Sequence, residues 1–409
     1  MYKETKLANG IIVASDEMPD IESVSVGVYI NAGARLENAK NNGVAHFLEH
    51  MAFKGTTTRS AQDIAKEIED VGGNMNAYTS YENTAYHVKL LHEDLPLALD
   101  ILGDILQNSV FDPVEMERER EVILQEIAQT NDTPDDLVFE NLQTICWPEQ
   151  SIGRPILGTI NSVKAIQKAD LQQFIDNNYI GKNIIISAAG RLKHNDLVTL
   201  TEKYFAKIAH KKTTSIPQAE YTGKTFVETK DLEQAHVVVA HEGVCYTDDD
   251  YYAANIWSAM LGGGMASRLF QEIREKRGLA YSIFSYNSSY DDTGMFCIYA
   301  GTSEEHVPEL MKIVQEECTK SINTLTKEEL KRAKAQYTAN MRMAQESSDS
   351  RMGRIPLCHF TDGRFKPLEE SLEDIEAVTL ADCTRVAKRI LATPRSISAL
   401  GAVKQEMFS

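Results

Sequence analysis

Hydrophobic and polar residues follow two distinct periodicities along the first half of the chain. Alternation at every second residue predicts a half-buried strand, whereas apolar residues that recur every three or four positions predict an amphipathic helix. The resulting order of elements indicates an α+β layout, with a sheet that helices cover on one side. The predicted strands are 23–30 and 84–91, and the predicted helices are 44–53, 61–71, 95–107 and one that begins at Pro113.

The second half runs through a similar order of elements. Its predicted strands are 236–244 and 294–301, and its predicted helices are 250–261, 267–278, 307–322 and 326–341. This similarity indicates a weak internal duplication with a period of about 200 residues. We therefore predict an α+β fold of two homologous α/β-sandwich domains, each a mainly antiparallel sheet covered by helices.

A polar, turn-rich segment separates the two halves. It reads AHKKTTSIPQAEYTG and covers Ala209–Gly223, which suits a linker between domains. We place the boundary near residue 215, which gives a first domain of residues 1–215 and a second of residues 216–409.

Composition narrows the class of protein. The chain has 409 residues, of which 43% are hydrophobic and 25% charged, and this is typical of a soluble globular protein. No secretory signal and no apolar run of about 18 residues is evident, so we expect no membrane insertion. The six cysteines are scattered without a CxxC pair, which argues against disulfides and thiolate zinc sites and favours the cytoplasm. The net charge of −18 disfavours nucleic acid as a partner and favours basic ligands.

The stretch GVAHFLEHMAFKGT contains the first candidate for chemistry. His46 and His50 are one helical turn apart and face the same way, so both imidazoles can reach one ion, with Glu49 beside them. The second copy has AMLGGGMASRLF in this place, so we expect only the first domain to bind a metal. The alternative interpretation is a solvated helix face, which most matches to so short a pattern represent.

A third ligand would most naturally be a carboxylate from the helix that follows Asp112. Asp112, Pro113 and Glu115 give this helix a clear start. Glu119 and Glu126 are two turns apart on it and share a face. The alternative is that this charged helix simply presents a solvated surface.

These motifs together resemble a known family. HFLEH, followed after 75 intervening residues by the glutamate that ends EREVILQE, is similar to the inverted zinc-binding signature of the pitrilysin, insulin-degrading enzyme and mitochondrial processing peptidase family. The resemblance covers almost the whole chain and is closest to the short, processing-peptidase-like members. It implies one Zn²⁺ per chain on His46, His50 and Glu126, with Glu49 as general base and Glu119 as a nearby essential carboxylate.

The resemblance also implies substrate contacts. GGNMNAYTSYENTAYHV is similar to the family's peptide-binding edge strand, which together with the metal helix implies contacts from Phe53, Asn76, Ala77 and Tyr78. Arg274 and Tyr281 in LFQEIREKRGLAYS match an arginine and a tyrosine that reach the active site in the family, although they could simply pack a helix on a strand. Asp136 and Glu140 fall where processing peptidases hold a substrate arginine, but could also be ordinary solvent-facing acids. One departure is the short LGGGMASR, where a non-catalytic processing subunit has a long glycine-rich loop.

The expected function is therefore a zinc metalloendopeptidase. It would cleave extended or presequence-like peptides, with a preference for arginine near the scissile bond, as a homodimer or as a heterodimer with a paralogue. The alternative is a non-catalytic core-type subunit of a larger assembly.

Overall fold

The computed structural model describes residues 1–209 and 216–408, which pack into two compact units. The first unit contains Met1–Ala128, Arg154–Pro217 and Met343–Phe365, and the second contains Gln129–Gly153, Gln218–Arg342 and Lys366–Ser409. The boundary predicted near residue 215 falls outside the described residues. The segments 129–153 and 343–365 each belong to the unit that is formed mainly by the other half of the chain.

A six-stranded sheet forms the centre of the first unit. Its strand order is β1-β2-β6-β3-β5-β4, and all neighbours are antiparallel except β2 and β6. The strands are β1 (Tyr2–Lys6), β2 (Ile12–Glu17), β3 (Ser23–Ile30), β4 (Asn74–Thr79), β5 (Thr84–Leu91) and β6 (Ile184–Gly190). The helices are α1 (Val44–Ala52), α2 (Ala61–Asp70), α3 (Leu95–Gln107), α4 (Pro113–Asp132, whose last turn belongs to the second unit), α6 (Ile160–Ala165), α7 (Lys168–Asn178), α8 (His194–Tyr204) and α12 (Ser348–Asp362).

Helices cover both faces of this sheet, and not one face as the sequence predicts. The even positions of β3, from Val24 to Ile30, join the main core, which also includes residues of α3. The odd positions face α12, where Ser25 contacts the hydroxyl of Ser348 at 2.8 Å and Tyr29 packs with Met352. Small and polar residues make up this second face, and such residues are typical of a strand face exposed to water. The sequence pattern therefore did not predict that α12 covers it.

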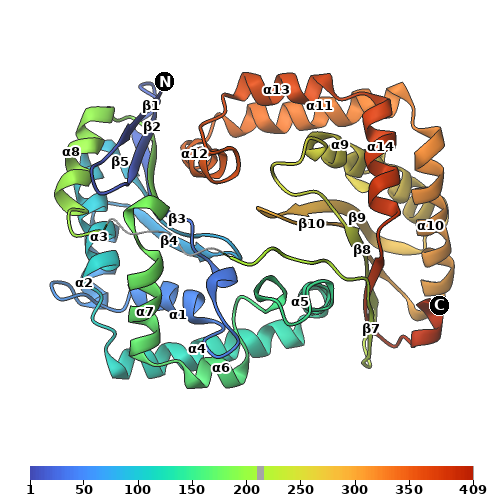
Figure 1. Cartoon of the computed structure of the whole chain (residues 1–409), viewed down its shortest axis with the longest axis horizontal. Helices are drawn as coiled ribbons and strands as arrows, with labels where there is room; N and C mark the ends of the chain where they lie inside the picture. The colour runs from blue at the N-terminus through green and yellow to red at the C-terminus, as the bar shows by residue number, and fades with distance from the viewer. Residues whose placement is uncertain (210–215, 409) are drawn as a thin grey trace. The chain divides into compact units, whose positions relative to one another are not determined.

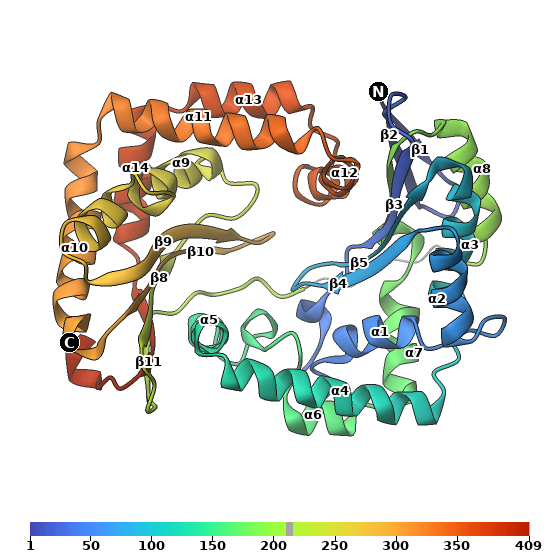
Figure 2. The ribbon, with the colours of Figure 1, turned by 180° about the vertical axis from the view of Figure 1, so that it is seen from behind.

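The second unit is built on a five-stranded sheet of order β7-β11-β8-β10-β9. The strands are β7 (Thr225–Thr229), β8 (Ala235–Glu242), β9 (Ala280–Ser289), β10 (Gly294–Thr302) and β11 (Arg395–Gly401). The helices are α5 (Pro134–Cys146), α9 (Tyr251–Gly262), α10 (Val307–Thr324), α11 (Lys327–Ala344, whose last residues belong to the first unit), α13 (Leu368–Ala377) and α14 (Leu380–Leu391). Figure 2 shows α9, α10 and α14 together on one side of this sheet, and α5 packs against β8 and β11. Short 3₁₀ turns lie at Ala34–Leu36, His92–Asp94, Ser151–Gly153, Gly181–Asn183, Glu304–His306 and Gln405–Phe408.

The two units confirm the predicted fold class and its repeated order of elements. In each unit a central strand precedes a helix, an antiparallel strand pair and two long helices. In each half, the helix that follows the long charged one packs on the sheet formed by the other half of the chain: α5 in the first half and α12 in the second. The predicted helix 267–278 differs in detail, because it contains a π-helical turn at Phe270–Glu275, where the amide of Lys276 donates to the carbonyl of Gln271 at 3.0 Å.

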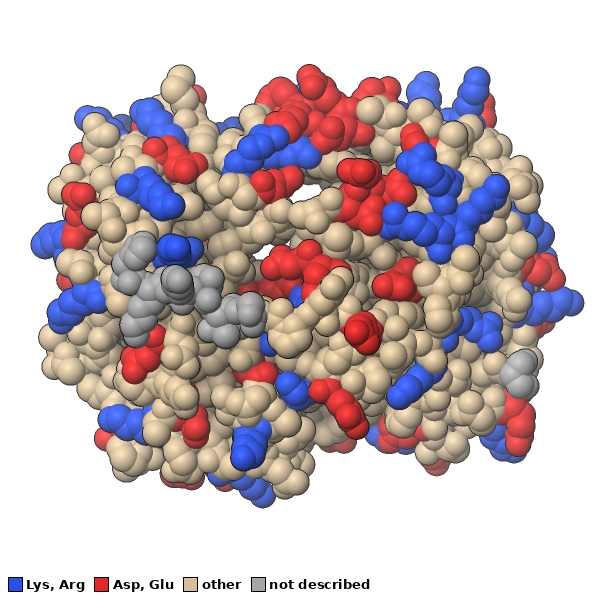
Figure 3. Space-filling view, viewed as in Figure 1, with Lys and Arg blue, Asp and Glu red and all other residues tan. Residues whose placement is uncertain are grey.

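Charged side chains of both signs are interspersed on the surface of each unit. Figure 3 shows a concentration of acidic side chains over α13, whose sequence LEESLEDIEA supplies five carboxylates. One of them, Asp374, pairs with Lys366 at 2.6 Å. In the described part of the chain, no helix combines the length and apolar character that crossing a membrane requires.

Candidate metal centre

Three potential metal donors from α1 and α4 come together in the first unit. The Nε2 atoms of His46 and His50 are 3.2 Å apart, and each is 3.6 Å from Oε2 of Glu126. In the described residues this is the one group of three or more His, Cys, Asp and Glu side chains that could hold an ion. The histidines are one turn apart on α1, and α4 supplies the carboxylate, as the spacing predicts.

The donor triangle has the dimensions of a zinc site. Atoms separated by 3.2 and 3.6 Å can all lie about 2.0–2.2 Å from one central ion, which are ordinary Zn–N and Zn–O distances. Oε2 of Glu126 is buried and has no hydrogen-bond partner among the described residues. Since a buried polar atom without a partner is unfavourable, an ion that binds it removes that penalty. Two imidazoles and one carboxylate therefore fit a zinc ion.

The surroundings keep His46 in the form that binds metal and fix the ring orientation of His50. Burial, and then the neighbouring His50, lower the pKa of His46 to about 3, so its imidazole is neutral. Nδ1 of His50 donates to Oε2 of the buried Glu119 at 2.9 Å, which leaves its Nε2 lone pair directed at the other donors. Lys54 contacts the second oxygen of Glu119 at 2.8 Å. The position of Glu119 is therefore that of a residue that orients a ligand.

Glu49 lies on the same helix but does not join the donor triangle. Its Oε2 accepts a hydrogen bond from the hydroxyl of Thr79 at 2.6 Å. Burial raises its pKa, although the bond from Thr79 opposes the shift. A carboxylate whose pKa is raised towards neutrality is a better proton acceptor, and this is the property that a general base requires. Thr79 ends β4, so the edge strand of the sheet holds this carboxylate in place.

A buried glutamate that the sequence analysis missed fixes the start of α1. Glu37 accepts hydrogen bonds from the backbone amides of Gly43 and Ala45, both at 2.8 Å, and from the side-chain amide of Asn42 at 2.9 Å. Because Gly43 at the N-cap has no side chain, this remote carboxylate supplies the cap that the helix needs. Burial raises the pKa of Glu37 to about 7 in spite of these bonds.

The loop Gly153–Gly158, with the sequence GRPILG, packs directly against that helix start. Gly43 has a φ of +94° and Gly158 a φ of +80°, both in the left-handed region that favours glycine. A Cβ on Gly43 would lie 2.8 Å from the carbonyl oxygen of Leu157, and one on Gly158 would lie 2.6 Å from that of Asn42. Two glycines are therefore required for the close backbone approach that sets the position of the metal helix.

Changing Glu37 to glutamine is expected to destabilise the start of α1. An amide has a single acceptor oxygen, so either Ala45 or the Asn42 and Gly43 pair would face an NH₂ group. The free energy of unfolding should fall by about 1–3 kcal/mol, as chemical denaturation would measure. The matched control is Glu69→Gln, at an exposed position at the end of α2. Equal stability of the two variants would contradict the capping role.

The residues predicted to bind substrate in the first unit lie at or near the sheet edge. β4 is an edge strand paired only with β5, and its residues alternate between exposed and partly buried. Asn76 and Tyr78 are exposed, with Ala77 between them on the other face. Phe53 follows the last residue of α1, and the centre of its ring lies 6.2 Å from that of the buried Tyr86. A strand edge beside Glu49 and the donor triangle is a surface to which an extended peptide can add.

The other predicted site residues belong to the second unit. The guanidinium of Arg274 lies 4.6 Å from the ring centre of Tyr281, so the two form a cation–π pair. Tyr281 is 77% exposed, which is unusual for an aromatic residue whose role is packing. Asp136 and Glu140 lie one turn apart on α5, and the pKa of Glu140 is raised by burial and then by Asp136.

Two comparisons of sequence place the chain near known proteins. Residues 12–160 match the model described as Insulinase (Peptidase family M16), and residues 165–337 match Peptidase M16 inactive domain. An uncharacterized zinc protease of Rickettsia felis is 39% identical over 401 residues, covering 98% of this chain and 97% of the relative. The mitochondrial-processing peptidase subunit beta of Saccharomyces cerevisiae is 36% identical over 420 residues, which cover 98% of this chain and 91% of that subunit.

Solved structures share the same fold. A protease from Helicobacter pylori superposes with a TM-score of 0.91 at 23% identity, covering 98% of this chain and 99% of the other. A structure described as peptidase M16 inactive domain, from Pseudomonas fluorescens, gives a TM-score of 0.92 at 20% identity and covers 98% of each chain. At these identities the likeness establishes the arrangement of elements alone.

Proposed function

The chain belongs to the insulinase family of peptidases, peptidase family M16, and from this premise we propose that it is a zinc-dependent endopeptidase. One zinc ion per chain would be held by His46, His50 and Glu126. The observation that carries the proposal is the triangle of donor atoms 3.2 and 3.6 Å apart, beside a glutamate that takes no part in it. The names of the relatives, which are zinc proteases, support the same metal.

The protein's own residues supply the acid–base chemistry and the orientation. Zinc at this site would contribute Lewis acidity, which polarises a peptide carbonyl and makes a water molecule easier to deprotonate. Glu49 takes the proton of the attacking water on its free carboxylate oxygen while Thr79 holds the other oxygen. Glu49 then returns the proton to the departing amine. Glu119 keeps Nδ1 of His50 protonated and its ring fixed.

The edge strand would position the substrate. A peptide that adds to β4 is bound through main-chain hydrogen bonds, which do not depend on side-chain identity. The proposal therefore includes tolerance for many sequences, with specificity left to side chains that contact particular substrate residues.

The experiment that tests the proposal combines metal analysis with peptide hydrolysis. The purified chain should contain about one zinc and cleave an internally quenched peptide with an arginine near its centre. A zinc chelator should abolish cleavage, and added zinc should restore it. Sedimentation of the same sample, expected at about twice the 45.7 kDa of one chain, tests the predicted homodimer. A folded chain that contains zinc but shows no cleavage, or cleavage that chelators do not affect, would contradict the proposal; a folded, metal-free and inactive chain would favour an assembly subunit.

We further propose that Asp136 and Glu140 favour substrates with arginine near the scissile bond. Burial, and then Asp136 one turn away, raise the pKa of Glu140, so a cation that binds beside this carboxyl group would favour its charged form. A substrate guanidinium would supply that cation through charge-assisted hydrogen bonds.

Neutralising this pair should lower kcat/KM for the arginine peptide about 10- to 100-fold, the effect of a lost charge-assisted bond. The variant is Asp136→Asn with Glu140→Gln, assayed on matched peptides that carry arginine or citrulline. The control is Glu369→Gln with Glu373→Gln, two exposed acids that are also four apart, on α13. If kcat/KM falls by the same factor for the arginine and the citrulline peptide, Asp136 and Glu140 have no role in specificity.

A further inference from the structure

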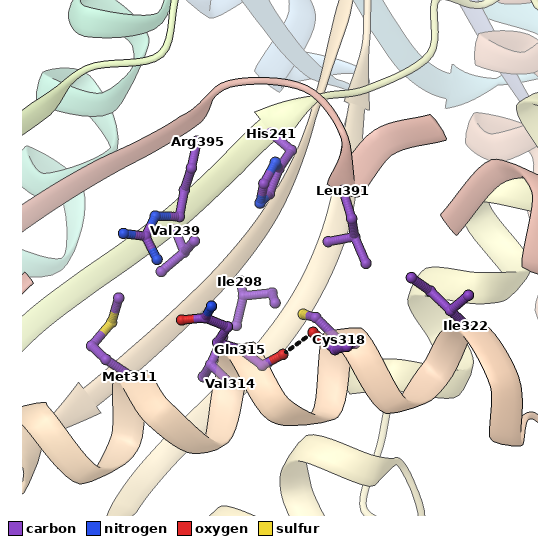
Figure 4. Close-up of a pocket in the computed structure, with 11 residues that line it drawn as sticks. Val239, His241, Ile298, Met311, Val314, Gln315, Cys318, Ile322, Leu391 and Arg395 are labelled. Atoms are coloured by element: carbon purple, nitrogen blue, oxygen red, sulfur yellow. Dashed lines mark hydrogen bonds between the residues drawn. The ribbon is translucent and has the colours of Figure 1, made fainter. Parts of the chain in front are cut away.

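The second unit contains a hollow that the proposed peptidase chemistry does not use. It has a volume of about 260 Å³ and lies between α10, the strands β8 and β10, and the turn from α14 into β11. All its lining residues belong to the second unit, whereas the metal donors belong to the first. Figure 4 shows side chains from the sheet and from α10 entering it from opposite sides.

One part of the hollow is apolar. Val239 of β8 and Ile298 of β10 are direct partners in register and line the sheet side. Met311, Val314 and Cys318 line the opposite side, from successive turns of α10, and all three are buried. This surface suits a short hydrocarbon group and offers no charged partner to it.

The other part carries two nitrogen-rich side chains. Arg395 and His241 are direct partners in register on β11 and β8, so both point to the face that α10 covers. Nδ1 of His241 donates to the carbonyl of Thr393 at 3.1 Å, which leaves its Nε2 atom for another partner. Figure 4 shows the two side chains on the same side of the hollow.

Arg395 lacks an anionic partner in the described residues. Its hydrogen bond is a long one, 3.5 Å, to the carbonyl of Phe408, and no described Asp or Glu carboxylate lies within 4.0 Å of its guanidinium. Arg395 is exposed at the start of β11, and in a chain with a net charge of −18 it stands beside the apolar hollow with no described carboxylate next to it. Burial, and to a smaller extent Arg395, lower the pKa of His241, so its imidazole stays neutral and Arg395 supplies the positive charge beside the hollow.

We propose that this hollow binds a small carboxylate with a short apolar tail. The carboxylate would accept hydrogen bonds from the guanidinium of Arg395, and the tail would lie against Val239, Ile298 and the buried side chains of α10. The volume equals about nine waters at about 30 Å³ each, which corresponds to a tail of six to eight carbons. Two sources share this chemistry: a medium-chain fatty acid, and a peptide C-terminus that ends in an apolar residue.

Titration of the full chain with octanoate tests the proposal, by calorimetry or by ligand-observed NMR. Octanoate should bind saturably, and octylamine, which has the same tail and the opposite charge, should bind at least tenfold more weakly. N-acetyl-leucine and its methyl ester form the second pair. Tighter binding of octanoate assigns the hollow to fatty acids, and tighter binding of N-acetyl-leucine assigns it to peptide termini. The measurement involves no hydrolysis, so its outcome is independent of the proposed peptidase activity.

Two variants test whether octanoate binds in this hollow. Arg395→Met keeps the apolar stem and removes the charge, and it should weaken octanoate binding at least tenfold, whereas Arg332→Met at an exposed position of α11 should not. Gln315→Trp adds bulk at an exposed lining position of α10, and Lys312→Trp adds it on the same helix outside the lining. Gln315→Trp should reduce octanoate binding, and Lys312→Trp should leave it unchanged. Absence of saturable binding by both carboxylates, or equal binding by wild type and Arg395→Met, would show that the hollow is a packing defect.

Discussion

Replacing Glu49 by glutamine is expected to leave zinc bound and to reduce peptide hydrolysis by a factor of about 10² to 10⁴, the usual contribution of a general base. The amide has nearly the same size and can still accept the hydrogen bond from Thr79, which is 2.6 Å long in the wild type. It cannot take a proton from water. Since Glu49 is not one of the three donors around the candidate ion, the zinc content of the variant should equal that of the wild type.

The measurement is kcat for the quenched peptide together with zinc per chain, both determined on the same preparation. Glu121→Gln provides a matched control, because it makes the same chemical change at an exposed position of α4. A variant that loses zinc along with activity would place Glu49 among the ligands. A variant that keeps most of its activity would remove it from the mechanism.

Local periodicity predicts the bounds of several elements of the first unit with good accuracy. The predicted strands 23–30 and 84–91 have the bounds of β3 and β5, and the predicted helix 95–107 has those of α3. These segments combine a clear apolar period with turn residues or caps at their ends, so local and tertiary preferences agree. The grouping of His46, His50 and Glu126 was inferred partly from helical spacing and partly from the family resemblance, because periodicity cannot say which of two helices lies beside the other.

The pattern of hydrophobic and polar residues does not predict contacts between segments that are distant in the sequence. Glu37 caps α1 from outside the helix, and Thr79 reaches Glu49 from a different strand. A signal was present in the first case: Gly43 offers no side chain to cap α1, so another residue had to do so. Likewise α5 and α12 pack on sheets from the other half of the chain, and contiguous hydrophobic patterns carry no information about such an exchange.

This exchange has consequences for the unit that holds the donors. α12, although it follows α11 of the second half, contacts β2, β3 and β6, and the hydroxyl of Ser187 donates to the carbonyl of Met352 at 2.7 Å. Buried polar contacts of this kind are unfavourable if either side is removed. The first 215 residues therefore lack part of the packing that supports their own sheet, and the metal centre depends on a segment about 300 residues away from α1 in the chain.

Replacing Glu126 by glutamine should remove both zinc and activity, whereas Glu49→Gln is expected to keep zinc and lose activity. The variant replaces an anionic donor by a neutral amide, which is a poor zinc ligand, and leaves two imidazoles. Glu119→Gln should give an intermediate result. Changes in groups that orient a ligand typically weaken metal binding about 10- to 100-fold, and the carboxylate of Glu119 contacts Nδ1 of His50 and the ammonium of Lys54.

Competition with a chelator of known affinity measures zinc binding of both variants against wild type, with Glu121→Gln again as the control. The expected order of affinity is wild type, then Glu119→Gln, then Glu126→Gln. The order distinguishes the two carboxylates on α4, which face the same side of the helix and touch different groups. If Glu119→Gln loses more zinc than Glu126→Gln, the assignment of ligand and orienting residue must be reversed, because the carboxylate in direct contact with the ion contributes more to its binding than one that acts through an imidazole.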